Sequence, residues 1–125
     1  MYQNKHLLGG LLVAGWDKEN GSQVYSISMG GALMSENWHV DGSGSTYIWG
    51  ICDASYKENM TKAEAQEFAI MALSCAMTRD SASGGMARLV TITPGGAERS
   101  LIRPKDFPVY PGEIPMPMQD TTMMD

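Results

Sequence analysis

Cysteine is scarce in this sequence of 125 residues, and its scarcity excludes several classes of protein. Two cysteines, Cys52 and Cys75, do not make the disulfide framework of a small secreted domain, and no zinc-site spacing surrounds them. We therefore expect neither a metal ion nor a cofactor. Reduced thiols indicate a protein of the cytoplasm and the nucleus.

Long apolar runs and positive charge are also lacking. The longest apolar run, residues 7–15, is about half as long as a membrane-spanning helix needs, so we expect no membrane association. Nine Lys and Arg against 14 Asp and Glu give a net charge of −5, which argues against a nucleic-acid partner. Hydrophobic residues make up 43% and charged residues 18%, the balance of a globular chain.

What is present begins with a predicted hairpin. Residues 11–16 form a short apolar run, typical of a buried strand. Residues 17–21 form a polar turn that ends in Asn-Gly, and residues 23–29 then alternate polar and apolar. Residues 32–34 extend or restart this strand, and we interpret residues 38–40 as another short one.

Two helices are predicted to follow. Residues 43–57 suit a strand as well, but their apolar side chains also fall at helical spacing, and we favour a helix. Thr61 and Glu64 form a capping box at the start of the second helix. An apolar stripe then continues to about Arg79, where a basic side chain suits the end of a helix. Both cysteines fall on these helices and are interpreted as packing residues.

A second hairpin, with strands over residues 88–93 and 97–102, is expected around Pro-Gly-Gly. Strands that flank a helical pair predict a layered α+β domain over residues 1–103. Residues 104–125 carry five prolines and no clear period, so we interpret them as an extended C-terminal tail.

Two Ser/Gly turns carry the predicted chemistry. One precedes the first helix and the other follows the second, so an antiparallel helical pair would bring Ser43, Asp80 and Ser83 together. Two hydroxyls and a carboxylate can orient a nucleophile and tune its pKa, but they contain no good nucleophile–base pair of their own. No serine has glycine at both −2 and +2, and nothing in the sequence places His6 or His39 beside a serine.

Over roughly residues 8–103 the sequence resembles the C-terminal portion of a eukaryotic 20S proteasome beta subunit, an N-terminal-nucleophile hydrolase. The residues that carry this resemblance are most similar to those of the beta-1 type, the caspase-like subunit. The resemblance implies part of a four-layer αββα sandwich whose N-terminal half is missing. The segments that carry it are residues 10–17, 24–31, 42–50, 53–64 and 79–88.

The resemblance also implies an activity and partners. In that family an N-terminal threonine attacks the peptide bond, and its own α-amino group serves as base. By matching position, Ser43, Asp80 and Ser83 would hold and polarise that amine. The expected partners are other proteasome alpha and beta subunits and polypeptide substrates, which the caspase-like type cuts after acidic residues.

The sequence departs from the family pattern at residues on which the activity of the family depends. The catalytic threonine and the inner aspartate and lysine are absent, and the 125 residues contain no Gly-Thr bond whose cleavage would release a threonine. Ser81 and Ala82 replace Gly and Ser; Ala82 is expected to be harmless, whereas Ser81 occupies a position where glycine suits a positive φ.

Three hypotheses follow. The chain supplies supporting residues to an active threonine endopeptidase, or it is a catalytically inactive structural fragment that assembles with other subunits. The third hypothesis, a free-standing binding domain, is disfavoured because half of a layered sandwich leaves sheet edges and an apolar face uncovered.

Overall fold

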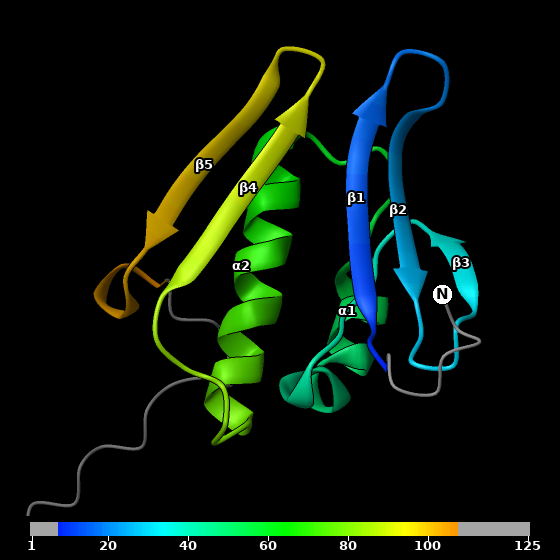
Figure 1. Ribbon diagram of the computed structural model, residues 1–125. Helices are drawn as coiled ribbons and strands as arrows, with labels where there is room; N and C mark the ends of the chain where they lie inside the picture. The colour runs from blue at the N-terminus through cyan, green and yellow to red at the C-terminus, as the bar shows by residue number, and fades with distance from the viewer. Residues whose placement is uncertain (1–7, 108–125) are drawn as a thin grey trace, which may run out of the picture.

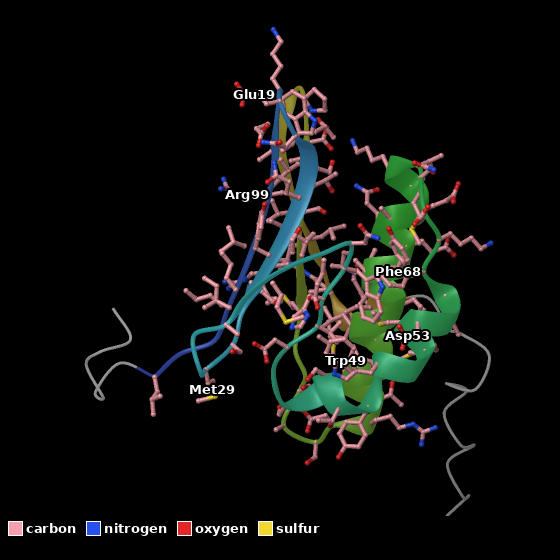
Figure 2. The ribbon with its side chains drawn as sticks, turned by 90° about the vertical axis from the view of Figure 1, so that its right-hand side faces the viewer. Glu19, Met29, Trp49, Asp53, Phe68 and Arg99 are labelled. Carbon is pink, nitrogen blue, oxygen red and sulfur yellow. The ribbon has the colours of Figure 1, made fainter. Side chains whose placement is uncertain are left out.

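The computed structural model describes residues 8–107, which form a layer of strands against a layer of helices (Figure 1). Figure 2, turned by 90°, shows the strands on one side and the helices on the other. The elements in chain order are β1 (Leu11–Asp17), β2 (Gly21–Ile27), β3 (Leu33–Glu36), the 3-10 helix η1 (Ser43–Tyr47), α1 (Trp49–Ser55), α2 (Lys62–Arg79), β4 (Ala87–Thr93), β5 (Gly96–Ile102) and the 3-10 helix η2 (Pro104–Asp106).

The first predicted hairpin is confirmed, and the strand expected to extend or restart at residues 32–34 is observed as β3, Leu33–Glu36. β1 pairs antiparallel with β2 along its whole length, and β2 pairs with β3. Residues 38–40, predicted as a strand, are not one, because β3 ends at Glu36. The Trp38 ring packs instead against Trp49 and Phe68, with ring centroids 5.4 Å and 6.3 Å away. Burial of that large ring among the helices outweighs the extended preference of the segment.

The second hairpin is confirmed too. β4 and β5 pair antiparallel over seven residues each, from Ala87 opposite Ile102 to Thr93 opposite Gly96. β4 runs beside β1 in the strand layer, although the two belong to separate hydrogen-bonded sheets (Figure 1). Residues 104–106 form the short helix η2, so the start of the predicted tail is a turn rather than extended chain. Residues 108–125, the rest of that tail, lie outside the described residues.

The helical prediction for residues 43–57 is confirmed, as a 3-10 turn followed by α1. α2 begins where the capping box predicts: the Thr61 hydroxyl accepts from the Glu64 N–H at 3.2 Å. The Glu64 carboxylate accepts from the Thr61 hydroxyl at 3.2 Å. α2 ends at Arg79, as predicted, and Asp80 is its C-terminal cap.

The buried core lies within the helix layer. Ile48, Cys52, Ala72 and Ala76 form it, and Trp38, Val40, Phe68 and Cys75 pack around it as partly buried side chains. Cys52 is fully buried, which confirms its packing role. The expectation that residues 11–16 form a buried strand is wrong, because Leu11, Leu12 and Val13 are 45% to 52% exposed.

One face of the strand layer carries the exposed apolar side chains. Leu12 lines a cavity against α2, so by alternation Leu11 and Val13 point away from the helices. The strand register and the burial pattern place further apolar residues on that face, which we call the outer sheet face. Its members are Leu11, Val13, Leu33, Val90, Ile92 and Leu101, each 42% to 65% exposed.

The observed class is therefore mixed helix and strand, in agreement with the predicted α+β class. The structure contains one strand layer and one helix layer among the described residues, which is consistent with part of an N-terminal-nucleophile hydrolase fold. A strand layer covered on one side only explains why its apolar outer face meets solvent.

Candidate functional site

The three predicted site residues lie in contact. Ser43 Oγ and Ser83 Oγ each donate a hydrogen bond to Asp80 Oδ2, both at 2.6 Å. The backbone N–H of Ala82 donates to the other carboxylate oxygen, Oδ1, at 3.1 Å. Asp80 is only 8% exposed, so the buried carboxylate is satisfied by three donors. The convergence expected of Ser43, Asp80 and Ser83 is confirmed; their catalytic role stays a prediction.

Two tight turns position these side chains. Asp80 caps α2, with its N–H bonded to Ala76 O at 2.8 Å, and the next turn closes where Ser83 N–H donates to Asp80 O at 3.1 Å. Ser43 opens η1 directly after Gly42, whose φ of 90° suits glycine. Ser45 N–H and Ser45 Oγ both donate to Gly42 O, at 3.1 Å and 2.7 Å, and fix the first turn.

The electrostatics of the cluster favour a charged carboxylate. The Ser43 hydroxyl, followed by the Ser83 hydroxyl and the Ala82 N–H, lowers the pKa of Asp80 below its ordinary value against the opposing effect of burial. Asp80 is therefore ionised at neutral pH. Because both hydroxyl protons are committed to Asp80, each serine oxygen turns its lone pairs outward and can accept from a further donor.

Gly44 is a site residue that sequence reasoning passed over. An added Cβ at this buried position would lie 2.9 Å from Ser83 Oγ, 3.1 Å from Ala76 Cβ and 3.4 Å from Asp80 Oδ2. The absent side chain therefore lets η1 approach α2 closely enough for Ser43 to reach Asp80. The Gly-Ser-Gly-Ser turn contains the signal, but only the packing shows which glycine is needed for contact.

The concern over Ser81 is not supported by the backbone. Among the described residues, Asn59 is the one non-glycine residue with a positive φ, at 57°, so Ser81 is not in that region. The positive φ of this turn falls on Gly85, at 91°. Ala82 contributes a backbone N–H to Asp80, a bond that any residue except proline can make.

A cavity of about 490 Å³ adjoins the cluster, between the strand and helix layers. Ser43 and Ser83 line it from the two turns, Leu12 lines it from β1, and His39 lines it from the loop after β3. Among residues 8–107, His39 makes no hydrogen bond with either serine, so the cluster holds no serine–histidine pair. His6 lies outside the described residues.

Within the described part of the chain, no group of three or more His, Cys, Asp or Glu side chains is placed to hold a metal ion. In the same part of the chain, no helix has the length and apolarity that crossing a membrane requires. The described site thus consists of hydroxyls, one carboxylate and backbone groups.

The described residues define a two-layer α+β segment with a buried Ser–Asp–Ser cluster where its helices end, and no serine–histidine pair is formed among them. The family model described as proteasome subunit matches residues 1–92, and the chain belongs to the proteasome subunit family. The similarity to relatives identifies it further as the C-terminal portion of a beta subunit.

Three of these relatives show the extent of the similarity. The chain is 47% identical to proteasome subunit beta type-6 of Dictyostelium discoideum, over 87% of the chain and 51% of the relative. It is 50% identical to probable proteasome subunit beta type-1 of Schizosaccharomyces pombe, over 78% of the chain and 44% of the relative. It is 46% identical to proteasome subunit beta type-9 of Mus terricolor, over 86% of the chain and 48% of the relative. The chain thus spans about half the length of the curated relatives that it matches.

Proposed function

We propose that this chain is an assembling segment of a proteasome core-particle beta subunit that hydrolyses no peptide bond by itself. In the assembled subunit it supports a threonine endopeptidase, whose N-terminal threonine comes from polypeptide outside these 125 residues. The observation that carries the proposal is the composition of the cluster: among the described residues, the base in contact with the two hydroxyls is the Asp80 carboxylate, whose lowered pKa makes it a weak base.

The geometry explains what the cluster contributes. An N-terminal threonine uses its α-amino group as base, and a free α-amino group has a pKa of about 7.7–8.0. The oxygens of Ser43 and Ser83, with their protons committed to Asp80, offer acceptors to the N–H groups of such an amine. The negative charge of Asp80 then stabilises the amine after it has taken the proton of the threonine hydroxyl.

The outer sheet face supports the assembly part of the proposal. Six apolar side chains on that face are exposed, an arrangement that marks a surface for another polypeptide. We propose that polypeptide corresponding to the remaining half of the relatives covers it and completes the four-layer αββα sandwich. Neighbouring alpha and beta subunits would then surround the domain, and polypeptides would be its substrates.

The first experiment compares the chain alone with a reconstituted subunit. Purified full chain is assayed with fluorogenic peptides, then combined with a polypeptide that covers the first half of a beta subunit and begins with threonine. We expect no hydrolysis by the chain alone and hydrolysis after reconstitution. Hydrolysis by the chain alone that Ser43→Ala abolishes would show that the cluster is itself catalytic, and the proposal would be wrong.

Matched serine variants then test the cluster. Ser43→Ala and Ser83→Ala are each expected to lower reconstituted activity roughly 10²-fold, the scale of lost acid–base support. Ser45→Ala is the control in the first turn, because its hydroxyl donates to Gly42 O rather than to Asp80. Ser81→Ala is the control in the second turn. Equal losses in all four variants would indicate general damage to the fold rather than support of an amine.

The beta-1, caspase-like subtype is the finer part of the proposal. The relatives bear the type numbers 6, 1 and 9 in their names, so the names alone leave the subtype open. A panel of peptides with acidic, basic or apolar residues before the cleaved bond tests it. Preferential cleavage after acidic residues by the reconstituted subunit supports the caspase-like type, and preference for another class refutes it.

A further inference from the structure

A second polar cluster lies between the sheet and the loop that leads to the site. Within residues 8–107, His39 Nδ1 is buried and makes no hydrogen bond of normal geometry, but it forms a close ion-pair contact with Glu36 Oε2 at the end of β3. The same Oε2 atom accepts a hydrogen bond from Ser26 Oγ on β2 at 3.4 Å. Ser26 is 6% exposed, and the Glu36 and His39 side chains are 25% and 19% exposed. The cluster therefore links two strands of the first sheet to the loop.

The other side of the His39 ring reaches the start of α1. Its centroid is 5.2 Å from that of Trp49, with the rings edge to face, and the Trp38 ring is 5.4 Å from the same indole. Residues 38 and 39 thus touch residue 49, and the intervening segment forms a closed loop. Ser43 and Gly44 lie inside that loop, so its closure sets where the Ser43 hydroxyl sits.

Within residues 8–107, polar contacts also join the second hairpin to α2. Both contacts involve the first turns of α2. Lys62 Nζ forms an ion pair with Glu98 Oε2 at 2.6 Å, and Gln66 Nε2 donates a hydrogen bond to Thr91 Oγ1 at 2.9 Å. Asp80 lies at the opposite end of that 18-residue helix, about 27 Å away along its axis. Near the Asp80 end, the Glu36–His39 contact connects the strands to the loop of Ser43.

We propose that His39, held by Glu36, is a positioning residue for Ser43. In this proposal the Glu36 carboxylate, in contact with Nδ1, keeps the imidazole proton on that nitrogen and holds the ring against Trp49, which closes the loop that presents Ser43 to Asp80. This inference rests on the proposed function, because it assigns a role in arranging the same cluster. His39 touches none of the reacting atoms and acts through Ser43.

The test uses two spectroscopic readouts in the full chain. With only two histidines in the sequence, ¹⁵N-histidine labelling and the control variant His6→Gln isolate the His39 signals. We expect the nitrogen shifts of a ring protonated on Nδ1, and loss of that pattern in Glu36→Leu. The second readout is the ¹³C titration of the Asp80 carboxyl, assigned by comparison with Asp80→Asn, because Ser43 is the largest cause of its lowered pKa.

Four variants give the expected pattern. Glu36→Leu and His39→Phe, which remove the polar contact while retaining bulk, should raise the pKa of Asp80 toward the ordinary aspartate value. Glu36→Gln keeps an acceptor oxygen and should retain the parent pKa. Lys62→Ala is the matched control, because it breaks an ion pair at the far end of α2. If Glu36→Leu does not fold, His39→Phe, which preserves the ring against Trp49, decides the question.

The outcomes separate this inference from the proposed function. An Asp80 pKa at its ordinary value in the parent chain would remove the basis of the proposed site. A lowered pKa in the parent that is unchanged in Glu36→Leu and His39→Phe would overturn the positioning role alone. A rise in Glu36→Gln as large as that in Glu36→Leu would also overturn it, since the acceptor oxygen would then be irrelevant.

Discussion

Replacement of Gly44 by alanine tests the close packing on which the site depends. The new methyl group would lie 2.9 Å from Ser83 Oγ and 3.1 Å from Ala76 Cβ, both closer than such atoms normally approach. Ser83 can rotate away only by giving up its hydrogen bond to Asp80. Ala76 is fixed on α2 and cannot rotate away, so η1 must otherwise move outward from the helix.

The expected magnitude follows from two opposing effects. Overpacking costs about 1–3 kcal/mol, whereas alanine in place of glycine gains about 0.5–1 kcal/mol from the unfolded chain. We therefore expect Gly44→Ala to lower the free energy of unfolding by up to about 2.5 kcal/mol, with a fall in Tm of about 4–8 °C per kcal/mol for a domain of this size. The pKa of Asp80 should rise at the same time, because a donor to its carboxylate is displaced.

The matched control is Gly50→Ala on α1. Nothing lies within 4 Å of a Cβ built at Gly50, so the same chemical change meets open space. It should raise the free energy of unfolding by about 0.5–1 kcal/mol. Thermal unfolding of both variants followed by circular dichroism, with the Asp80 titration by ¹³C NMR, measures the contrast. Equal stability of the two variants, with an unchanged Asp80 titration, would refute the close approach of η1 to α2.

Three further predictions concern stability and reactivity. The pKa of Asp80 in the folded chain is lowered, so its contribution to stability is complete above about pH 4 and is lost as the pH falls through the folded-state pKa. The urea midpoints at pH 7 and pH 3 should therefore differ less in Ser83→Ala than in the parent. Thr61→Ala removes the N-cap of α2 and should cost about 1 kcal/mol in urea unfolding, and retention of the parent midpoint would show that the cap contributes nothing. Burial, followed by the nearby Asp53 carboxylate, raises the pKa of the Cys52 thiol. In the variant Cys75→Ser, where Cys52 is the remaining cysteine, a thiol reagent should therefore react only after unfolding. Rapid labelling of the folded variant would contradict the core packing of Cys52.

The local features of this fold were predictable from the sequence. Alternating residues and Asn-Gly located the first hairpin, and Thr61 with Glu64 located the start of α2, because these signals act within a few residues of chain. The convergence of Ser43 with Asp80 followed from one topological step, the antiparallel return of a helical pair. Such predictions succeed because they require no knowledge of side-chain packing.

The remaining features depend on which surfaces meet. The run at residues 11–16 has the composition of a buried strand, but Val13 is 52% exposed because only one face of its sheet is covered. Trp38 leaves the strand pattern because the helices and the residue after α1 offer it three aromatic partners, Trp49, Tyr56 and Phe68. The roles of Gly44 and of the Glu36–His39 contact likewise depend on contacts between elements, which a linear pattern does not specify.

The polar cluster and the exposed apolar face belong to different layers of the segment. All three donors to Asp80 come from η1 and from the turn after α2, so the cluster is complete within the helix layer and its adjoining turns. The outer sheet face lies on the opposite side of the strand layer, where a further polypeptide can cover it without disturbing those bonds. Under the proposed function, the preformed cluster would lose little conformational freedom on binding a threonine amine, because its hydroxyls and carboxylate already hold one another in place. This arrangement would then let a segment without its own N-terminal threonine determine the geometry of a peptidase site.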